Sequence, residues 1–197
     1  MRASAKTVRD RVGRPTHRPR RWHATGSAIR QARLSELSAV WRLGVACFSD
    51  DGLSHAVLGH YLTARDSTIL VVRRGSALAG FAVLRLARDR GRAIAIIVSI
   101  GVDPEHRGNG IGRHLLREAQ RWCQQAGAEC VQLKVAQDNV VALALYRSHG
   151  YRVVGRLPHY YGVGRDGLRM ERPAQPAASV MDPLKSGPAS AMIPTDR

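Results

Sequence analysis

The chain has 197 residues, enough for one globular domain with some additional sequence, and 44% of them are hydrophobic. No apolar run approaches the roughly 18 residues needed to cross a bilayer, so the sequence predicts a soluble protein without a transmembrane segment. The formal net charge is +16 at pH 7, of which +7 lies on residues 1–27 and +9 on residues 28–172; the charge of this middle part argues mildly against polycationic amines as ligands, which it would repel.

The three cysteines, Cys47, Cys123 and Cys130, are odd in number and lack the spacing of a metal site. Each lies in an apolar pattern, which predicts reduced thiols in the core of a cytoplasmic protein that holds no metal. A reactive cysteine is the alternative interpretation.

The positive charge is concentrated at the start of the chain. Residues 1–27 carry eight Lys or Arg against a single acid, Asp10, and have no hydrophobic periodicity. They also lack the apolar core of a secretory signal. This composition predicts a disordered Arg-rich extension that could contact nucleic acid or ribosomes weakly through its charge.

The folded part is expected to begin with a short strand over residues 28–32. Apolar residues at helical spacing then predict an amphipathic helix that ends near residues 49–52. A second helix begins after Ser54, a good N-cap.

Three β-rich runs follow at residues 68–73, 78–87 and 92–102. The connections between them are short and rich in turn residues, which predicts a meander of antiparallel strands.

A glycine-rich turn then links the third strand to a helix over residues 111–126. Its glycines, at positions 108, 110 and 112, let the backbone adopt positive φ and approach a ligand closely. The first N–H groups of the following helix point outward, at the positive end of the helix dipole. The turn therefore indicates a diphosphate site. It matches neither a P-loop nor a dinucleotide fingerprint, and an ordinary glycine turn is the alternative.

The helix leads to a strand over residues 129–136, and the connection is long enough for a parallel crossover, so the sheet is expected to be mixed. Asp138 is expected to cap the next helix, which runs to Gly150. Strands over residues 151–157 and 168–172 close the sheet. The Pro/Ala/Ser-rich residues 173–197 are expected to form a flexible tail.

Residues 102–116 resemble the acyl-CoA loop of the GNAT superfamily of N-acyltransferases, whose Arg/Gln-x-x-Gly-x-Gly/Ala signature is met by Arg107, Gly110 and Gly112. The similarity continues through residues 133–139, Ala142, residues 145–146 and residues 150–151. His159, Tyr160 and Tyr161, followed by residues 166–170, resemble the end of the ribosomal-protein N-terminal (alanine) acetyltransferase branch. The resemblance covers roughly residues 28–172.

The resemblance implies a three-layer α/β fold over residues 28–172, with about four helices flanking a mixed, mostly antiparallel sheet of about six to seven strands. It also implies acetyl-CoA as the cosubstrate, with no metal, and an amine as the acceptor. The residues that it places at acetyl-CoA are Ile100, Gly101, Val102, Arg107, Gly108, Asn109, Gly110, Ile111, Gly112, Arg113, Asn139 and Tyr146.

The resemblance also suggests how these residues act. The main chain of residues 100–102 would pair with the acyl-pantetheine arm, and one of its amides would polarise the acetyl carbonyl. A glycine at 101 agrees with such a close approach. Residues 108–113 would hold the diphosphate, and Asn139 would bind polar groups of the pantetheine.

Tyr146 matches the position whose hydroxyl protonates the departing sulfur. A phenol near pKa 10 and a thiol near 8.5 are close enough to share a proton in a dry site. A core tyrosine with its hydroxyl at the surface is the alternative.

The sequence departs from the pattern at the proton acceptor. The N-terminal acetyltransferase branch has Leu-Glu-Val where this chain has Leu133, Lys134 and Val135. A lysine cannot accept a proton unless its pKa falls well below about 10.4. An amine of low pKa is therefore favoured as the acceptor, namely the α-amine of a protein N-terminus or of a small amino compound.

Lys134, Tyr160 and Tyr161 are the predicted acceptor-binding residues, and packing is the alternative role for one of the two tyrosines. The resemblance also makes Asp50, Asp51, His55 and His60 candidates for acceptor contact, although for any one of them a solvated loop or helix surface is the preferred interpretation. Lys134 also keeps a second function class open, a catalytically weak or silent CoA-binding module that acts by interaction.

Overall fold

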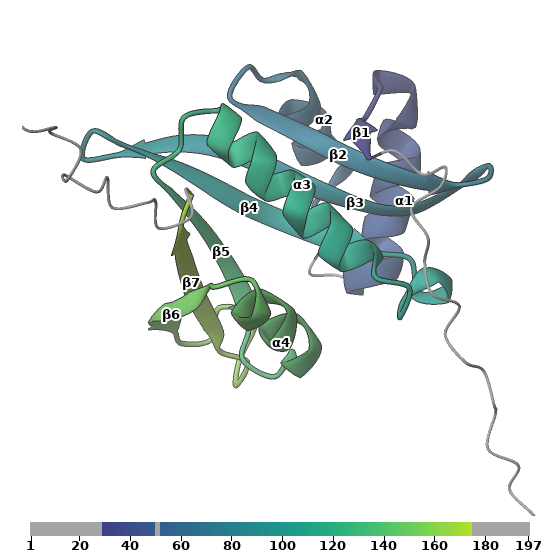
Figure 1. The fold of residues 1–197 in the computed structure, drawn as a ribbon. Coiled ribbons are helices and arrows are strands. Elements are labelled where there is room, and N and C mark those ends of the chain that lie inside the picture. Colours follow the sequence, from purple (N-terminus) through teal and green to yellow (C-terminus); the bar gives the residue numbers. More distant parts are fainter. Residues whose placement is uncertain (1–28, 50–51, 175–197) are drawn as a thin grey trace, which may run out of the picture.

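The computed structural model describes residues 29–49 and 52–174, and a seven-stranded sheet runs through this part of the chain in the order β1-β2-β3-β4-β5-β7-β6 (Figure 1). The strands are β1 (Arg30–Gln31), β2 (Ser67–Arg74), β3 (Ala77–Asp89), β4 (Arg92–Val102), β5 (Cys130–Ala136), β6 (Arg152–Leu157) and β7 (Gly167–Pro173). Neighbouring strands are antiparallel except for β4 and β5, which are parallel. The predicted mixed sheet is confirmed.

Helices cover both faces of the sheet. They are α1 (Leu37–Phe48), α2 (His55–Thr63), α3 (Ile111–Gln125) and α4 (Val140–Ser148), with short 3-10 turns η1 (Leu34–Glu36) and η3 (Pro104–His106). The Ser54 side chain accepts a hydrogen bond of 3.3 Å from the Val57 N–H and caps α2 as predicted. The opening strand is shorter than expected, since only Arg30 and Gln31 pair with β2.

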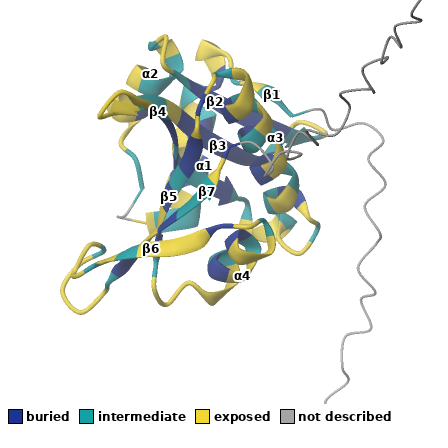
Figure 2. Cartoon of the chain, turned by 60° about the vertical axis from the view of Figure 1, so that its left-hand side comes forward, coloured by how far each residue is buried: buried dark blue, intermediate teal, exposed yellow. Residues whose placement is uncertain are grey.

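Successive residues of β2 point to opposite faces of the sheet, and both faces are buried. Ile69 and Val71 pack with Phe81 under α1 and α2, whereas Leu70 and Val72 belong to the larger core under α3. Because both faces of β2 are covered, the middle of its sequence is a continuous apolar run without polar alternation. Figure 2 shows the buried residues along the central strands and the exposed edge strand β6.

The parallel pair β4–β5 opens halfway along its length. The ladder joins residues 94–97 to residues 130–133 and stops there, although both strands continue. On its other side β4 has one extra residue, because Val83 pairs with Ser99 while Leu84 pairs with Ile97, which leaves Val98 as a bulge. A bulge bends and twists its strand. Beyond Val98 the two strands therefore diverge.

The segment after β5 differs from the sequence prediction at the start of α4. Asn139 is the N-cap, because its Oδ1 accepts a hydrogen bond of 3.0 Å from the Ala142 N–H. The predicted cap, Asp138, is exposed and lies 3.8 Å from Arg165. The end of the helix is as predicted, with Gly150 in the left-handed region at φ +82°.

The described sheet continues past residue 172, where the sequence predicted the domain to end. Strand β7 includes Pro173, and Ala174 is buried. The Ala174 carbonyl accepts a hydrogen bond of 2.7 Å from Gln124, and its N–H donates to the Glu129 carbonyl at 2.9 Å. These contacts fasten the last described residues to α3 and to the start of β5.

Two of the three cysteines lie in the core, as predicted, and all three are unpaired. Burial raises the pKa of Cys123 to about 12 and that of Cys130 to about 11. Cys47 is only half-buried, and its thiol donates to the Val102 carbonyl at 3.3 Å. None of the described helices combines the length and apolar composition of a membrane-spanning segment.

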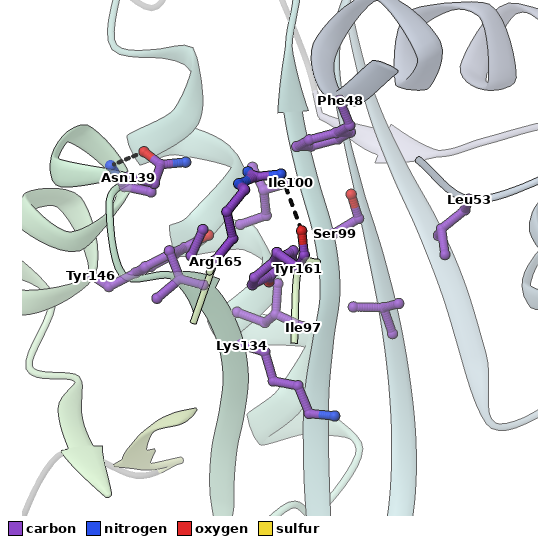
Figure 3. Close-up of a pocket in the computed structure, with 14 residues that line it drawn as sticks. Phe48, Leu53, Ile97, Ser99, Ile100, Lys134, Asn139, Tyr146, Tyr161 and Arg165 are labelled. Atoms are coloured by element: carbon purple, nitrogen blue, oxygen red, sulfur yellow. Dashed lines mark hydrogen bonds between the residues drawn. The ribbon is translucent and has the colours of Figure 1, made fainter. Parts of the chain in front are cut away.

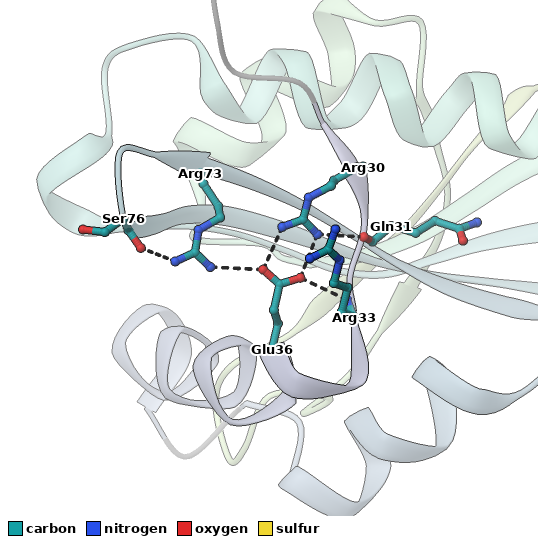
Figure 4. A network of polar contacts seen from close by, with 6 residues as sticks. All are labelled: Arg30, Gln31, Arg33, Glu36, Arg73 and Ser76. Carbon is teal, nitrogen blue, oxygen red and sulfur yellow. Dashed lines mark hydrogen bonds and ion pairs between the residues drawn. The ribbon is translucent and has the colours of Figure 1, made fainter.

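A buried carboxylate ties the first elements together (Figure 4). Glu36 is 8% exposed and receives two hydrogen bonds from Arg30, at 2.7 and 2.8 Å, and one from Arg73 at 3.0 Å. The Arg33 N–H donates a fourth at 3.0 Å. The hydrogen bonds from Arg30 are the main reason that the pKa of Glu36 falls to about 2. The network joins β1, η1 and β2 at the edge of the sheet.

Candidate functional site

The opening between β4 and β5 forms a cavity of about 190 Å³, roughly the space of six water molecules at their share of liquid volume (Figure 3). Its walls come from the end of α1, the divergent parts of β4 and β5, α4, and the loop between β6 and β7. The lining residues are Phe48, Leu53, Ile97, Val98, Ser99, Ile100, Lys134, Val135, Ala136, Asn139, Ala142, Tyr146, Tyr161 and Arg165.

The edge of β4 beyond the bulge presents main-chain groups to this opening. The Asp103 N–H donates to the Ala79 carbonyl of β3 at 3.1 Å. In an antiparallel pair the bonded side alternates with every residue, so the polar main-chain groups of Ile100 and Val102 point away from β3. The Val102 carbonyl accordingly accepts from Cys47 and from Arg107 Nε, at 3.3 and 3.2 Å. The described chain leaves the Ile100 edge unpaired with β5.

The structure gives a different reason from the predicted one for a glycine at position 101. It lies opposite Phe81 in the ladder, and a Cβ at 101 would come within 2.5 Å of the Phe81 ring. Its own main chain faces β3 by the same alternation. Gly101 therefore makes room for a core ring on the face covered by α1 and α2.

The glycine-rich turn has the backbone that the sequence predicted. Gly108 and Gly110 both have φ of +76°, and Gly110 is the N-cap of α3 without a side-chain cap. An α-helix offers no internal acceptor to its first N–H groups, those of Ile111, Gly112 and Arg113. A Cβ at Gly112 would meet neighbours only at 3.7 Å, which is ordinary contact. The N-terminus of α3 therefore offers an anion both space and main-chain N–H donors.

Three side chains of the turn face inward or brace the loop. Arg107 reaches back to the Val102 carbonyl, and Ile111 is 2% exposed in the core. The Asn109 amide donates to the carbonyls of His106 and Arg107, at 3.1 and 3.2 Å. The groups of this turn that can contact a ligand are therefore mainly main-chain N–H groups. The Arg113 side chain, by contrast, is exposed.

Tyr146 projects from α4 with its hydroxyl toward the cavity (Figure 3). The residue is 8% exposed, and its ring packs edge-on against Tyr151 with 5.8 Å between centroids. Burial, with a smaller contribution from Tyr161, raises its pKa to about 12. The hydroxyl therefore stays protonated at neutral pH and can donate its proton.

The other predicted residue of α4, Asn139, reaches the cavity from the helix end. Its side-chain oxygen caps the helix, so the side-chain NH2 is the group that remains to donate a hydrogen bond to a ligand. Leu143, on the same helix, is buried in the core.

Lys134 and the tyrosine pair meet on the other side of the cavity. Lys134 Nζ lies 3.1 Å from the Tyr160 hydroxyl and 4.4 Å from the centre of its ring. The rings of Tyr160 and Tyr161 are 5.0 Å apart in an edge-on arrangement. The side chain of Lys134 points away from Tyr146 (Figure 3). The predicted acceptor residues therefore lie together.

Several lining residues were not anticipated from the sequence, among them Phe48, Leu53, Ser99 and Arg165. Arg165 donates to the Tyr161 carbonyl at 3.3 Å and lies beside its ring. Phe48 ends α1, Ser99 lies in β4, and Leu53 and Arg165 lie in loops, and none of the four belongs to a motif that could have identified it.

Of the four further candidates for acceptor contact, Asp50 and Asp51 lie outside the described residues. His55 contacts Ser38 at 3.3 Å and the Trp41 ring, and His60 lies edge-on to Tyr61. Neither histidine lines the cavity. Both histidines are exposed on α2, and His55 also contacts α1.

The described lining of the cavity combines main-chain donors, one buried phenol and two cationic side chains, and it contains no carboxylate. In residues 29–49 and 52–174 no group of three or more His, Cys, Asp or Glu side chains could hold a metal ion. A strand edge that ends at a helix N-terminus suits an elongated ligand carrying a diphosphate.

Comparison with known proteins agrees with this geometry. The model of the acetyltransferase (GNAT) family matches residues 35–151. The chain is 38% identical over 142 residues to N-alpha-acetyltransferase RimI of Mycobacterium tuberculosis, covering 71% of this chain and 84% of that protein.

Among solved structures, the ribosomal-protein-S18-alanine N-acetyltransferase of Escherichia coli superposes with a TM-score of 0.69 at 21% identity, covering 79% of this chain and 99% of that one. A chain of the NatC complex, bound to Gag peptide and CoA, superposes with a TM-score of 0.67 at 22% identity, covering 75% and 98%. These two likenesses establish the fold.

The family model spans more than half of the chain, and the similarity to RimI extends over most of both proteins. The expected relationship to the ribosomal-protein N-acetyltransferase branch is confirmed. Acetyl-CoA is the cosubstrate. The chain belongs to the GNAT family and is an acetyl-CoA-dependent N-acetyltransferase.

Proposed function

We propose that the acceptor of this N-acetyltransferase is an α-amine, of a protein N-terminus or of a small amino compound. The observation that carries the proposal is the cavity beside Tyr146, whose described lining holds no carboxylate and has Lys134 where the N-terminal acetyltransferase branch has a glutamate base. The name of the RimI relative, an N-alpha-acetyltransferase, supports the same class of acceptor.

The choice of amine follows from the free energy of deprotonation. Without a side-chain base the amine must arrive neutral, or lose its proton through water. At pH 7 this costs about 4.6 kcal/mol for a lysine amine of pKa near 10.4, but only about 1 kcal/mol for an α-amine near 7.8. The difference of about 3.6 kcal/mol favours α-amines several hundredfold.

The residues divide into a donor side and an acceptor side. The donor side comprises the β4 edge at residues 98–102 and the turn at residues 103–113. The acceptor side comprises Phe48, Leu53, Lys134, Tyr161 and Arg165, with Tyr160 behind Lys134. Acetyl-CoA supplies the acetyl thioester. The N–H groups of the donor side hold the diphosphate and polarise the acetyl carbonyl.

Tyr146 stands between the two sides and donates a proton to the departing sulfur. Its pKa of about 12 exceeds that of a thiol in water, near 8.5, by roughly 3.5 units. Complete transfer would therefore be uphill by about 5 kcal/mol if only the phenol were buried. Desolvation raises the pKa of a buried thiolate in the same way, which narrows the gap.

A pH–rate profile of kcat/KM with a peptide acceptor tests the proposal. We expect activity to rise with the titration of the acceptor amine, near pH 7.8, and to follow that pKa when the acceptor is changed. An activity limb near pH 6 that belongs to the enzyme and is independent of the acceptor would contradict it.

The second candidate is a CoA-binding module with weak or no catalysis, and the specific observation in its favour is the ammonium group of Lys134. Calorimetric titration with CoA beside thioester consumption over a panel of amines separates the two. Binding without turnover on any amine would establish the module.

We also propose that residues 28–172 act as the catalytic unit, in the cytoplasm, and that residues 1–27 add a weak electrostatic contact with nucleic acid or ribosomes. Residues 1–28 and 175–197 lie outside the described part of the chain, and the unpaired buried thiols suit a reducing compartment. Salt-dependent RNA binding that is unchanged after deletion of residues 1–27 would reject the contact.

A further inference from the structure

We propose that the acceptor side selects amines that carry an anionic group close to the reacting nitrogen, such as a peptide N-terminus with an acidic side chain in its first two residues. This inference rests on the proposed function and names the acceptor more narrowly. It is carried by Lys134, a cation in the lining of the cavity, with Arg165 as the second cation of the same lining.

Lys134 is a cation held in place. Its ammonium contacts the Tyr160 hydroxyl at 3.1 Å and lies over the ring of the same residue at 4.4 Å. An ammonium group has three donors, so about two remain for a ligand. The aromatic contact restricts the flexible stem, which reduces the entropy lost when an anion binds.

Arg165 adds a second positive charge to the cavity lining, with its guanidinium on the side of Ile100 and Asn139 and apart from the Lys134 ammonium (Figure 3). Its guanidinium donates to the Tyr161 carbonyl and lies 3.8 Å from Asp138, which is 68% exposed and outside the cavity lining. The ion pair offsets part of this charge. Among the described residues Lys134 has no carboxylate partner and the cavity lining has no Asp or Glu, so the described part of the lining carries net positive charge.

The position of the charge relative to Tyr146 sets the position of the anion on the acceptor. The attacking amine must lie near the thioester, at the Tyr146 hydroxyl, whereas Lys134 points away from that hydroxyl (Figure 3). A positive wall beside a protonated amine repels it, and an anionic group one residue further along the acceptor removes that penalty. The same field favours the neutral form of the amine.

The test uses three peptides that begin with alanine and differ only at the second residue, which is Asp, Asn or Lys. For the wild-type protein we expect kcat/KM to be about tenfold higher for the Asp peptide than for the Asn peptide, and lowest for the Lys peptide. A tenfold ratio corresponds to about 1.4 kcal/mol. The ratio should shrink as salt is added.

Lys134→Met removes the charge and keeps most of the stem, and it should bring the Asp/Asn ratio close to one. Lys134→Glu should reverse the order in favour of the Lys peptide. Arg88→Met is the matched control, because Arg88 is an exposed cation in the β3–β4 hairpin, away from the cavity, and should leave the ratio unchanged. An Asp/Asn ratio in Lys134→Met within twofold of the wild-type ratio would overturn the inference.

Equilibrium binding of the same peptides to the CoA-loaded protein gives a readout that needs no turnover. Preferential binding of the Asp peptide, lost in Lys134→Met, supports the inference even if no peptide is acetylated, in which case only the proposed function fails. Equal binding of the Asp and Asn peptides by the wild-type protein, with or without turnover, overturns it.

Discussion

The donor side and the acceptor side of the cavity are built in different ways. The donor side offers main-chain groups, those of Ile100, Val102 and the start of α3, and several of its side chains turn inward. The acceptor side offers side chains, chiefly Lys134 and Arg165, from elements far apart in the sequence. Main-chain donors tolerate sequence change, whereas side-chain contacts change with each substitution. Cosubstrate choice should therefore be robust and acceptor choice variable.

The largest expected effect is at Tyr146, where the two sides meet. Tyr146→Phe removes the only described hydroxyl of a tyrosine on α4 and should lower kcat by about 10² to 10³, because general-acid catalysis contributes on that scale. CoA affinity and thermal stability should change little, since the ring remains. Because the pKa of Tyr146 is about 12, the wild-type activity should show no falling limb below about pH 10. Unchanged kcat in the variant would remove the assigned role.

Gly101→Ala tests whether this glycine belongs to the core rather than to the ligand. The new Cβ would lie 2.5 Å from the Phe81 ring, so we expect a loss of about 2 kcal/mol in the free energy of unfolding, which chemical denaturation measures. Phe81→Leu should relieve the clash, so the double variant should lose less than the sum of the single changes. Additive losses would indicate that the ring is not the constraint.

Gly110→Ala tests the donor side. It forces a side chain to adopt φ of +76°, which costs about 1 kcal/mol and shifts the turn that presents the first N–H groups of α3. We expect calorimetry to show CoA affinity weakened about tenfold. Gly91→Ala is the matched control, since Gly91 has φ of +85° in the β3–β4 hairpin and no atoms near its Cβ position. Equal loss of affinity in both variants would contradict a local role for the turn.

The smallest expected effect is at Glu36, which belongs to neither side. Glu36→Gln should lower the free energy of unfolding by about 1 kcal/mol and leave kcat/KM unchanged. The folded pKa, about 2, lies below the ordinary value of 4.5. The carboxylate therefore stabilises the fold fully above about pH 5, and this contribution is lost as the pH falls toward 2. Urea denaturation between pH 7 and pH 2.5 should show the wild-type advantage shrinking as the pH approaches the folded pKa; an advantage as large at pH 2.5 as at pH 7 would refute this account.

Much of the fold could be predicted because its signals are local. The apolar runs predicted the β2–β4 meander, Ser54 marked the start of α2, and Gly150 marked the end of α4. The cap at Asn139 was missed because Asp138 is an equally good capping residue one position earlier. Only the backbone at the end of β5 decides which of the two reaches the first turn.

The sequence by itself determined the turn proposed to bind the diphosphate. This turn depends only on neighbouring residues, namely two glycines with positive φ followed directly by the N-terminus of α3. The tertiary structure alone decided where β4 and β5 part, why residue 101 is a glycine, and how Lys134 is held. The bulge at Val98, the Phe81 ring and the Tyr160 hydroxyl act across pairs of residues far apart in the chain. Such contacts leave no periodic pattern, so they become visible only when the sheet brings their partners together.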